Sequence, residues 1–271
     1  MDEITVAALQ MMLTHKEVKA NISHLRSLLQ ANEGGFDVLL LPEMWTTGFV
    51  VDVDRMSPQF FADAYEEGRQ EMKAVAREYQ CAVYGSLIQL LPSGRPANTG
   101  LFITPEGGEV EYHKRHLFSH GGEAKLFDAG MERVQVEYRD WQIRLAICYD
   151  LRFPTWLRQD PELGYYDLLL CTANWPRPRH VAWERLLRAR AIENQCYLGA
   201  CNRVGTPHPK LQYPGYSFVI DDEGNSLAES KLPDEVLLRA TISRQRLQEK
   251  RQSFPLLPDQ DLFRVIDERQ P

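Results

Sequence analysis

The sequence predicts an α/β domain in which two β-sheets pack against each other and helices cover the outside. Short apolar runs typical of strands alternate along the chain with segments of helical periodicity. Two of these runs, residues 37–41 and 167–171, resemble each other and suggest two related halves. No linker rich in Pro, Gly or Ser separates the halves, and 271 residues can bury a substantial core. We therefore expect one domain over residues 1–252.

The first half of the chain contains the elements expected for one sheet and its helices. In order, these are a strand at 4–11, a helix at 16–29, a strand at 37–41, a helix at 58–79, and strands at 82–89, 99–104 and 109–113. The run 37–41 is apolar after its first residue, as expected of a central strand covered on both faces. The second helix opens at Ser57-Pro58, where proline fits because a first-turn N–H needs no partner.

The second half repeats this alternation after a long loop. The loop spans residues 114–131 and contains several glycines, which suggests a functional role. We then expect a hairpin of strands 134–138 and 142–147, a strand at 167–171, a helix at 179–195, and strands at 196–201, 215–220 and 236–242, with a turn at 221–225 between the last two. The inward face of that helix should carry Trp183, Leu186, Leu187, Ala191 and Ile192. Residues 253–271 form an irregular tail that we expect to pack on another surface, such as a partner subunit.

The composition limits the partners and the compartment. A formal net charge of −7 argues against binding to nucleic acid or to an anionic membrane, since both require a basic surface. The first residues lack the basic flank and apolar core of a signal peptide, and no apolar stretch reaches membrane-spanning length. The five cysteines are an odd number without paired spacing, so we expect a reduced, cytoplasmic setting.

The strongest candidate for chemistry is Cys148, at the end of a predicted strand. Apolar residues alternate up to Ile147, and Pro154 then occupies a position suited to the first turn of a helix. This pattern indicates a strand–turn–helix elbow that holds the sulfur at the carboxyl edge of a sheet. Backbone N–H groups of the following helix would point at the group that the sulfur attacks. The alternative is that Cys148 is a small buried hydrophobic residue, as most free cysteines are.

Glu43 and Lys114 also follow predicted strands, and ligand sites in α/β proteins gather at the carboxyl ends of strands. A thiol nucleophile needs a proton acceptor and a cation that stabilises the negative charge formed during attack. Partial desolvation of Glu43 would raise its proton affinity and suit it to act as a base. Taken singly, Glu43 could instead be a helix cap or a surface acid, and Lys114 a solvated loop lysine.

Three ordered segments resemble the signature motifs of the nitrilase superfamily of carbon–nitrogen hydrolases. They are Leu41-Pro42-Glu43, His113-Lys114-Arg115-His116-Leu117-Phe118 and Ile147-Cys148-Tyr149-Asp150-Leu151-Arg152-Phe153-Pro154. The segments 167–174 and 190–195 also look like parts of this family, so the resemblance covers nearly the whole chain. Within the superfamily, residues 42–49 and 173–176 are most similar to the omega-amidase branch, especially its bacterial members.

This resemblance implies a four-layer αββα sandwich and a Glu–Lys–Cys triad. Cys148 would be the nucleophile, Glu43 the general base and Lys114 the cation beside the tetrahedral intermediate. Glu123 matches a second glutamate that orients the lysine or shuttles protons. The backbone N–H of Tyr149 would share the oxyanion with Lys114. No metal or organic cofactor is implied, and the resemblance suggests a homodimer.

The omega-amidase resemblance also implies a substrate class: small ω-amides of dicarboxylic acids, such as 2-oxoglutaramate and 2-oxosuccinamate, cleaved through a Cys thioester to acid plus ammonia. Their free carboxylate requires a cation, for which Arg152 is the first candidate and Arg177 the second. Arg152 could instead form a salt bridge with Asp150 or a neighbouring acid. The residues next to the motifs that we expect to contact the substrate are Trp45, Phe118, Asn174 and Trp175, and Phe49 and Tyr149 could also line the pocket.

Three other interpretations use the same residues. The triad could act on a nitrile or an N-carbamoyl compound. His113, His116, His120 and Glu123 could bind a metal, although their spacing matches no known zinc pattern. A non-enzymatic binding module is disfavoured because all three triad residues are present. Packing within or beside strands accounts for the remaining cysteines, Cys81, Cys171, Cys196 and Cys201.

Overall fold

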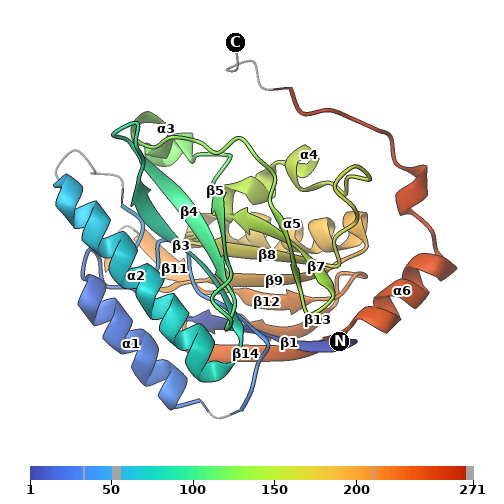
Figure 1. Ribbon diagram of the computed structural model, residues 1–271, viewed down its shortest axis with the longest axis horizontal. Helices are drawn as coiled ribbons and strands as arrows, with labels where there is room; N and C mark the ends of the chain where they lie inside the picture. The colour runs from blue at the N-terminus through green and yellow to red at the C-terminus, as the bar shows by residue number, and fades with distance from the viewer. Residues whose placement is uncertain (33, 51–55, 210, 267–271) are drawn as a thin grey trace.

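The computed structural model describes residues 1–266 except 33, 51–55 and 210. Two six-stranded sheets pack face to face, with α1 (Val18–Gln30) and α2 (Pro58–Tyr79) outside the first sheet and α5 (His180–Asn194) outside the second (Figure 1). The expected four-layer αββα sandwich is confirmed. Among the described residues, none of the helices combines the length and apolar character needed to cross a membrane.

The first sheet has the strand order β14-β1-β2-β3-β4-β5. Its strands are β1 (Glu3–Gln10), β2 (Val38–Leu40), β3 (Ala82–Leu90), β4 (Pro96–Ile103), β5 (Glu109–His113) and β14 (Val236–Ser243). The strands β1, β2 and β3 are parallel, whereas β4, β5 and β14 pair antiparallel to their neighbours. All of β2 is buried, as its apolar sequence predicts.

The second sheet has the order β13-β12-β9-β8-β7-β6 and the same plan. Its strands are β6 (Gln135–Tyr138), β7 (Trp141–Ile147), β8 (Leu168–Ala173), β9 (Tyr197–Asn202), β12 (Ser217–Ile220) and β13 (Ser226–Ser230). Here β7, β8 and β9 are parallel and the outer strands are antiparallel. The two similar apolar runs of the sequence therefore form the middle strand of each parallel triplet, β2 and β8.

The main core lies between the sheets. It includes Val6, Leu40, Tyr84, Leu145, Leu168 and Leu170, all fully buried. Two polar contacts also join the sheets at the ends of β2 and β7: the Tyr84 hydroxyl donates to the carbonyl of Ala146 at 2.9 Å, and the Thr172 hydroxyl donates to the carbonyl of Leu41. The core and these contacts fix the carboxyl ends of both parallel triplets relative to each other.

The helices begin largely where the sequence places them. The α2 helix starts at Pro58, and the hydroxyl of Ser57 accepts a hydrogen bond from the backbone N–H of Phe60. On α5 the expected inward position of Ile192 is wrong, because this side chain is 48% exposed. The helical period turns two polar residues, Arg190 and Asn194, inward instead. The guanidinium of Arg190 is satisfied there by the carbonyl of Leu151.

Outside the loop 114–131, four strands or helices of the described residues do not appear among the expectations. They are the two-stranded ladder of β10 (Val204–His208) and β11 (Leu211–Pro214), the edge strand β13, and helix α6 (Arg244–Ser253). The turn 221–225 therefore joins β12 to β13 and not to β14. These segments carry few apolar residues, and in α6 only Leu247 is buried. Beyond α6, residues 254–266 contain a single 3₁₀ turn, Leu257–Asp259.

Candidate active site

The residues predicted to do chemistry meet at one end of the sandwich. Glu43 follows β2, Lys114 follows β5 and Cys148 follows β7, while Glu123 begins the short helix α3 (Glu123–Leu126). All four are buried, with exposed fractions of 0% for Glu43 and Glu123, 1% for Lys114 and 8% for Cys148. We call these four residues the buried cluster.

The ammonium group of Lys114 lies between two carboxylates. Its Nζ donates to Oε1 of Glu43 at 2.7 Å, and to Oε2 and Oε1 of Glu123 at 2.9 and 3.1 Å. Burial opposes the positive charge, but the carboxylates of Glu123 and Glu43 outweigh it and raise the pKa of Lys114 well above its usual value. The ring of Phe49 lies beside the ammonium, with Nζ 5.9 Å from its centroid. Lys114 therefore remains a fixed cation.

The carboxylate of Glu43 is held from both sheets. Its Oε1 accepts from Lys114 and, at 2.8 Å, from Nδ2 of Asn98 in β4. Its Oε2 accepts at 2.8 Å from the backbone N–H of Asn174, which follows β8. The side-chain amide of Asn174 also donates to the backbone carbonyl of Glu43 at 2.7 Å. These bonds leave little freedom for the carboxylate to rotate.

Glu123 reaches the cluster because the loop after β5 turns back on itself. Gly122 adopts a left-handed conformation with φ of 87°, which favours glycine. The backbone N–H of Phe118 donates to Oε2 of Glu123 at 2.7 Å. Burial raises the pKa of the Glu123 carboxyl, Lys114 lowers it and the charge of Glu43 raises it further, with a net upward shift. The expected proximity of Glu123 to Lys114 is present.

Cys148 occupies the elbow between β7 and a 3₁₀ turn at Cys148–Arg152. Its φ is 47°, a left-handed conformation that is uncommon for a residue with a side chain and that marks functional turns. Pro154 starts the short helix α4 (Pro154–Leu157), as the sequence suggests. Burial and the Glu43 carboxylate, which also accepts a hydrogen bond from the thiol, raise the pKa of Cys148 well above its usual value, although Lys114 acts in the opposite direction. The resting cluster thus holds a protonated thiol beside a carboxylate.

The elbow is fixed by Asp150, which is fully buried. Its Oδ2 accepts from the Tyr112 hydroxyl at 2.7 Å and from the backbone N–H of Ile147 at 3.0 Å. Its Oδ1 accepts from the backbone N–H of His116 at 2.9 Å, and Nδ1 of the His116 ring also lies 2.9 Å from this oxygen. Arg152 forms no ion pair in the described part of the chain, so the alternative in which it pairs with Asp150 is wrong.

Aromatic and cationic side chains form a row of contacts on the loops next to the cluster; we call Phe118, Tyr149, Arg152, Trp175 and Arg179 the rim. The guanidinium carbon of Arg152 is 4.8 Å from the ring centroid of Trp175, and that of Arg179 is 5.3 Å from the ring centroid of Phe118. The Trp175 indole N–H donates to the carbonyl of Arg179 at 2.8 Å, and the rings of Phe118 and Tyr149 are 5.1 Å apart. Within the described residues, neither guanidinium has an acidic partner.

One expectation needs correction, and the residues of two alternatives have other partners in the structure. Trp45 is fully buried in the hydrophobic cluster between the first sheet and its helices, because the chain after β2 turns it inward, so it does not lie on the rim. The exposed guanidinium of Arg177 bonds to Gln212 in β11, at 2.9 Å. Residues of the suggested metal site have other partners. Nδ1 of His113 bonds to the Thr99 hydroxyl, His116 bonds to Asp150, and Glu123 bonds to Lys114. In the described ranges, no group of three or more His, Cys, Asp or Glu side chains is arranged to hold a metal ion.

Two residues of the site escaped the sequence analysis. Asn98 is a polar residue in the wholly buried strand β4, which is an informative signal because unpaired polar groups are rarely buried. Arg179 is the last residue of an Arg-Pro-Arg segment after Trp175. The Asn98 side chain bonds to Glu43 and Glu123, and the Arg179 guanidinium lies over Phe118. These contacts join distant parts of the chain.

The model of one protein family, described as carbon-nitrogen hydrolase, matches residues 5–252. The chain belongs to this family. The carbon–nitrogen hydrolase is 38% identical over 265 residues to the omega-amidase YafV of Escherichia coli, covering 98% of this chain and 100% of that protein. It is 33% identical over 267 residues to the 2-oxoglutaramate amidase of Bacillus subtilis, covering 96% and 99% of the two chains.

Among solved structures, a CN-hydrolase superfamily protein of Xanthomonas campestris with an arsenic adduct in its active site matches with a TM-score of 0.89 and 35% identity, covering 98% of this chain and 100% of that chain. The resemblance drawn from the sequence motifs is thereby confirmed. This carbon–nitrogen hydrolase is therefore an enzyme that cleaves carbon–nitrogen bonds.

The Asp150 network predicts a large effect on stability. Asp150→Asn replaces one acceptor oxygen by an NH₂ group and leaves buried donors unpaired, so we expect the free energy of unfolding to fall by roughly 2–4 kcal/mol. Urea denaturation measures this change. Asp63→Asn, on the exposed face of α2, is the control and should change stability by less than about 0.5 kcal/mol. Equal stability of the Asp150 variant and the wild type would contradict the assigned role.

Proposed function

We propose that this hydrolase removes the terminal amide of small dicarboxylic acid monoamides, of the 2-oxoglutaramate or 2-oxosuccinamate type, and releases the acid and ammonia. The observation that carries the proposal is the buried cluster, in which a thiol, a carboxylate and an ammonium group meet away from solvent. Relatives named omega-amidase and 2-oxoglutaramate amidase, at 33–38% identity, support the choice of substrate.

In the proposed first step, the sulfur of Cys148 attacks the amide carbonyl while Glu43 takes the thiol proton. The raised pKa of Cys148 means that little thiolate forms at rest, so proton transfer has to accompany attack. Glu43 suits this role because its carboxylate is held by Asn98 and Asn174 and borders the thiol. The proton therefore has a defined acceptor.

Attack converts the carbonyl oxygen into an oxyanion, which Lys114 and the backbone N–H of Tyr149 stabilise in this proposal. The ammonium of Lys114 is already charged and fixed, so it needs no rearrangement as the oxyanion forms. Glu123 keeps it in place. Loss of one such donor typically slows acyl transfer by roughly two to three orders of magnitude.

Collapse of the tetrahedral intermediate breaks the carbon–nitrogen bond. Glu43 returns its proton to the leaving nitrogen, ammonia departs, and the acyl group remains on Cys148 as a thioester. Glu43 then takes a proton from water, whose oxygen attacks the thioester carbonyl. The second intermediate collapses, the carboxylic acid leaves, and the thiol is protonated again.

The rim supports a substrate with a negative charge at the end opposite the amide. Arg152 and Arg179 each stack on an aromatic ring, and neither has an acidic partner among the described residues. A guanidinium fork matches the geometry of a carboxylate and binds it through charge-assisted hydrogen bonds. We propose that Arg152 holds the substrate carboxylate and that Arg179 assists it. Phe118, Trp175 and Asn174 would border the bound substrate.

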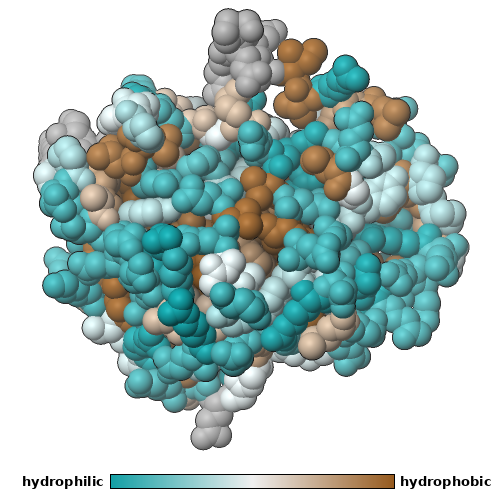
Figure 2. All heavy atoms as spheres, in the orientation of Figure 1, coloured by the Kyte–Doolittle hydropathy of each residue, from teal (hydrophilic) through white to brown (hydrophobic). Residues whose placement is uncertain are grey.

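We also propose that the enzyme is a cytoplasmic homodimer in which the C-terminal tail, residues 253–271, packs on the partner. The five cysteines are free and buried, which suits a reducing compartment. The tail exposes large apolar side chains, with Leu262 at 82% and Ile266 at 83%. Figure 2 shows hydrophobic side chains along the tail, at the top of a mostly hydrophilic face. Such exposure is typical of a surface that another protein covers.

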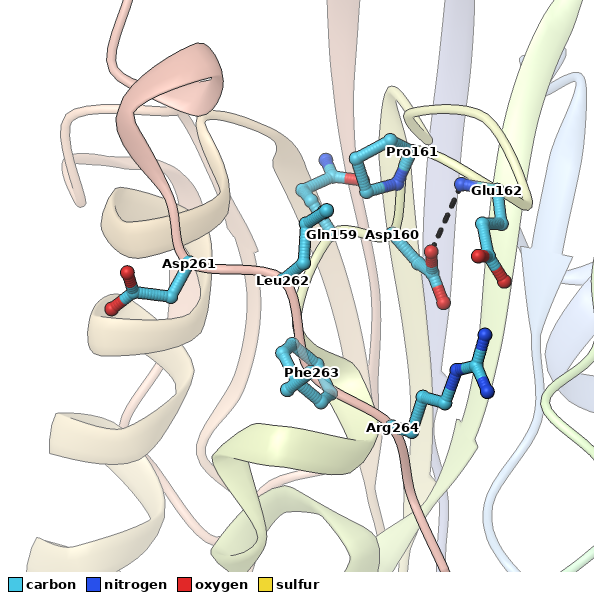
Figure 3. Close-up of a pocket in the computed structure, with 8 residues that line it drawn as sticks. All are labelled: Gln159, Asp160, Pro161, Glu162, Asp261, Leu262, Phe263 and Arg264. Atoms are coloured by element: carbon cyan, nitrogen blue, oxygen red, sulfur yellow. Dashed lines mark hydrogen bonds between the residues drawn. The ribbon is translucent and has the colours of Figure 1, made fainter.

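Figure 3 shows how the tail passes the body of the molecule. Residues 261–264 run alongside the loop 159–162 and leave a pocket between the two segments. Within this stretch Leu262 gains little cover from its own chain, since it remains among the most exposed residues. A second copy of the chain would supply the missing apolar contact.

The central prediction concerns Cys148. On a panel of small ω-amides, the wild type should release ammonia and the matching acid, and Cys148→Ala should release neither, because the proposed thioester forms on this sulfur. Cys81→Ala, which removes a buried cysteine remote from the cluster, is the control and should remain active. If an N-carbamoyl amino acid assayed beside this panel is the better substrate and releases ammonia and carbon dioxide, the carbamoyl alternative holds; activity in Cys148→Ala would refute the thiol mechanism.

A second prediction tests whether the two rim arginines bind the substrate carboxylate and take no part in the chemical step. For amides that carry a carboxylate, Arg152→Ala and Arg179→Ala should each lower kcat/KM by about 10- to 100-fold, the loss expected for a charge-assisted hydrogen bond. Neutral amides of the same length should be affected less than about threefold, because they lack the charge. Arg177→Ala, which removes a nearby exposed guanidinium, is the matched control. Equal losses on charged and neutral amides would argue against carboxylate recognition.

A third prediction tests the tail. Removal of residues 261–271, or the double substitution Leu262→Asp and Ile266→Asp, should convert a dimer into a monomer, as measured by light scattering at micromolar concentration. Leu232→Asp, at a leucine that is 63% exposed but far along the chain from the tail, should leave the dimer intact. A wild type that is monomeric, or a truncated chain that still dimerises, would contradict this arrangement.

A further inference from the structure

Asn98 occupies a central position in the site; the sequence motifs do not include it, and the proposed reaction uses it only as one of the groups that hold Glu43. It lies in β4, one strand away from the edge of the first sheet, and is fully buried. Its backbone carbonyl accepts a hydrogen bond at 2.9 Å from the N–H of Lys114, where the chain leaves β5. The residue that carries the ammonium group is thus fixed to β4 through its backbone.

The side chain of Asn98 connects the two carboxylates of the buried cluster. Its Nδ2 donates to Oε1 of Glu43 at 2.8 Å and to Oε1 of Glu123 at 3.2 Å. Lys114 bridges the same two carboxylates, so each one is held by a charged donor and by a neutral donor. Asn98 is therefore bonded to three members of the cluster that come from separate segments of the chain.

The electrostatics of the cluster explain why a second donor is useful. Two carboxyl groups share one ammonium in a place without solvent, so the cluster carries an excess of negative charge whenever both are ionised. Hydrogen bonds to the ionised form of a carboxylate favour that form, whereas burial and a like charge favour protonation. A neutral NH₂ group that donates to both carboxylates stabilises both charges and adds none of its own.

The orientation of the Asn98 amide follows from the same contacts. If the amide were turned over, its oxygen would face two carboxylate oxygens, which would repel it. In the present orientation Oδ1 is buried without a hydrogen-bond partner among the described residues. Burying an acceptor without a partner is unfavourable. The amide keeps this orientation because its NH₂ group then bonds to both carboxylates.

We propose that Asn98 is a positioning residue for this reaction: its NH₂ group holds the carboxylates of Glu43 and Glu123 on either side of Lys114 and keeps Glu43 oriented to accept the thiol proton. This inference rests on the proposed function, in which Glu43 is the base. It predicts that Asn98 acts through Glu43 on the chemical step, with little contact to the substrate.

Several titratable groups face Glu43, and they restrict the interpretation of a pH profile. Lys114 and Glu123 bond to the same network, and Cys148 borders it. More remote groups are Cys171 in β8, Tyr84 in β3 and Tyr213 in β11, and burial raises the pKa of each of these three. They therefore stay neutral in the acidic range. A shift of the acidic limb on loss of Asn98 therefore does not come from these three groups.

The test compares kcat and KM against pH for wild type, Asn98→Ala, Asn98→Asp and the control Thr99→Ala. Thr99 is equally buried in β4, but its hydroxyl bonds to Gln89 and His113 and not to the cluster. Asn98→Ala should lower kcat by about 10- to 100-fold, with KM changed by less than about threefold. Asn98 donates to the Glu123 carboxylate, whose pKa burial already raises, so loss of this donor makes Glu123 easier to protonate and should move the acidic limb upward by about one pH unit.

Asn98→Asp distinguishes a donor role from simple packing. The two side chains have nearly the same shape, so a packing role predicts that the aspartate variant is more active than the alanine variant. The donor role predicts that it is no better, because a third carboxylate replaces the NH₂ group. Thr99→Ala should keep the acidic limb of the wild type. If Asn98→Ala does not fold, Asn98→Ser provides the same comparison, since its hydroxyl is too short to reach both carboxylates.

The experiment distinguishes a failure of the proposed function from a failure of the inference about Asn98. If the wild type shows no amide hydrolysis that depends on Cys148, the proposed function is wrong, whatever Asn98 does. If the wild type is active but Asn98→Ala keeps the acidic limb and kcat of the wild type, the inference about Asn98 is wrong and the proposed function stands. Thermal unfolding of each variant separates a loss of kcat from a loss of folded protein.

Discussion

The sharing of one buried ammonium group between two buried carboxylates is the interaction on which the rest of this site depends. Removing any of these charges from water is unfavourable, and only close pairing and full hydrogen bonding offset that loss. The structure meets both conditions for Lys114, whose Nζ has three carboxylate contacts between 2.7 and 3.1 Å. The pairing also joins the loop after β2, the end of β5 and the start of α3. The same set of bonds therefore determines both the placement of the charges and the shape of the site.

The fold produces this arrangement through its internal repetition. Each sheet contains three parallel strands, and β2 and β8 are their middle members. The carboxyl ends of the two triplets supply complementary parts: the first sheet contributes Glu43, and the second contributes Cys148 and Asn174. Contacts from Tyr84 and Thr172 across the core hold these ends together. Side chains from the two sheets thus lie side by side without a flexible segment between them.

Much of the fold and part of the site could be predicted from the sequence, and particular residues show the physical reasons. Buried parallel strands are continuous apolar runs, so 37–41 and 167–171 stood out, whereas β13 and α6 carry too few apolar residues to show a period. Cys148 and Glu43 could be nominated because they end strands and match family motifs. Asn98 and Arg179 could not, since their partners lie far along the chain. Trp45 shows the reverse error: it stands next to a motif, but the chain turns it into the core.

The measurement that tests the account most directly is a titration of the enzyme with iodoacetamide, a small electrophile with an amide group, followed by peptide mass mapping and assay of amide hydrolysis. Our account predicts that activity falls in proportion to carbamidomethylation of Cys148 and reaches zero at one modified thiol per chain. Full modification of Cys148 with activity retained, or inactivation while Cys148 stays unmodified, would contradict it.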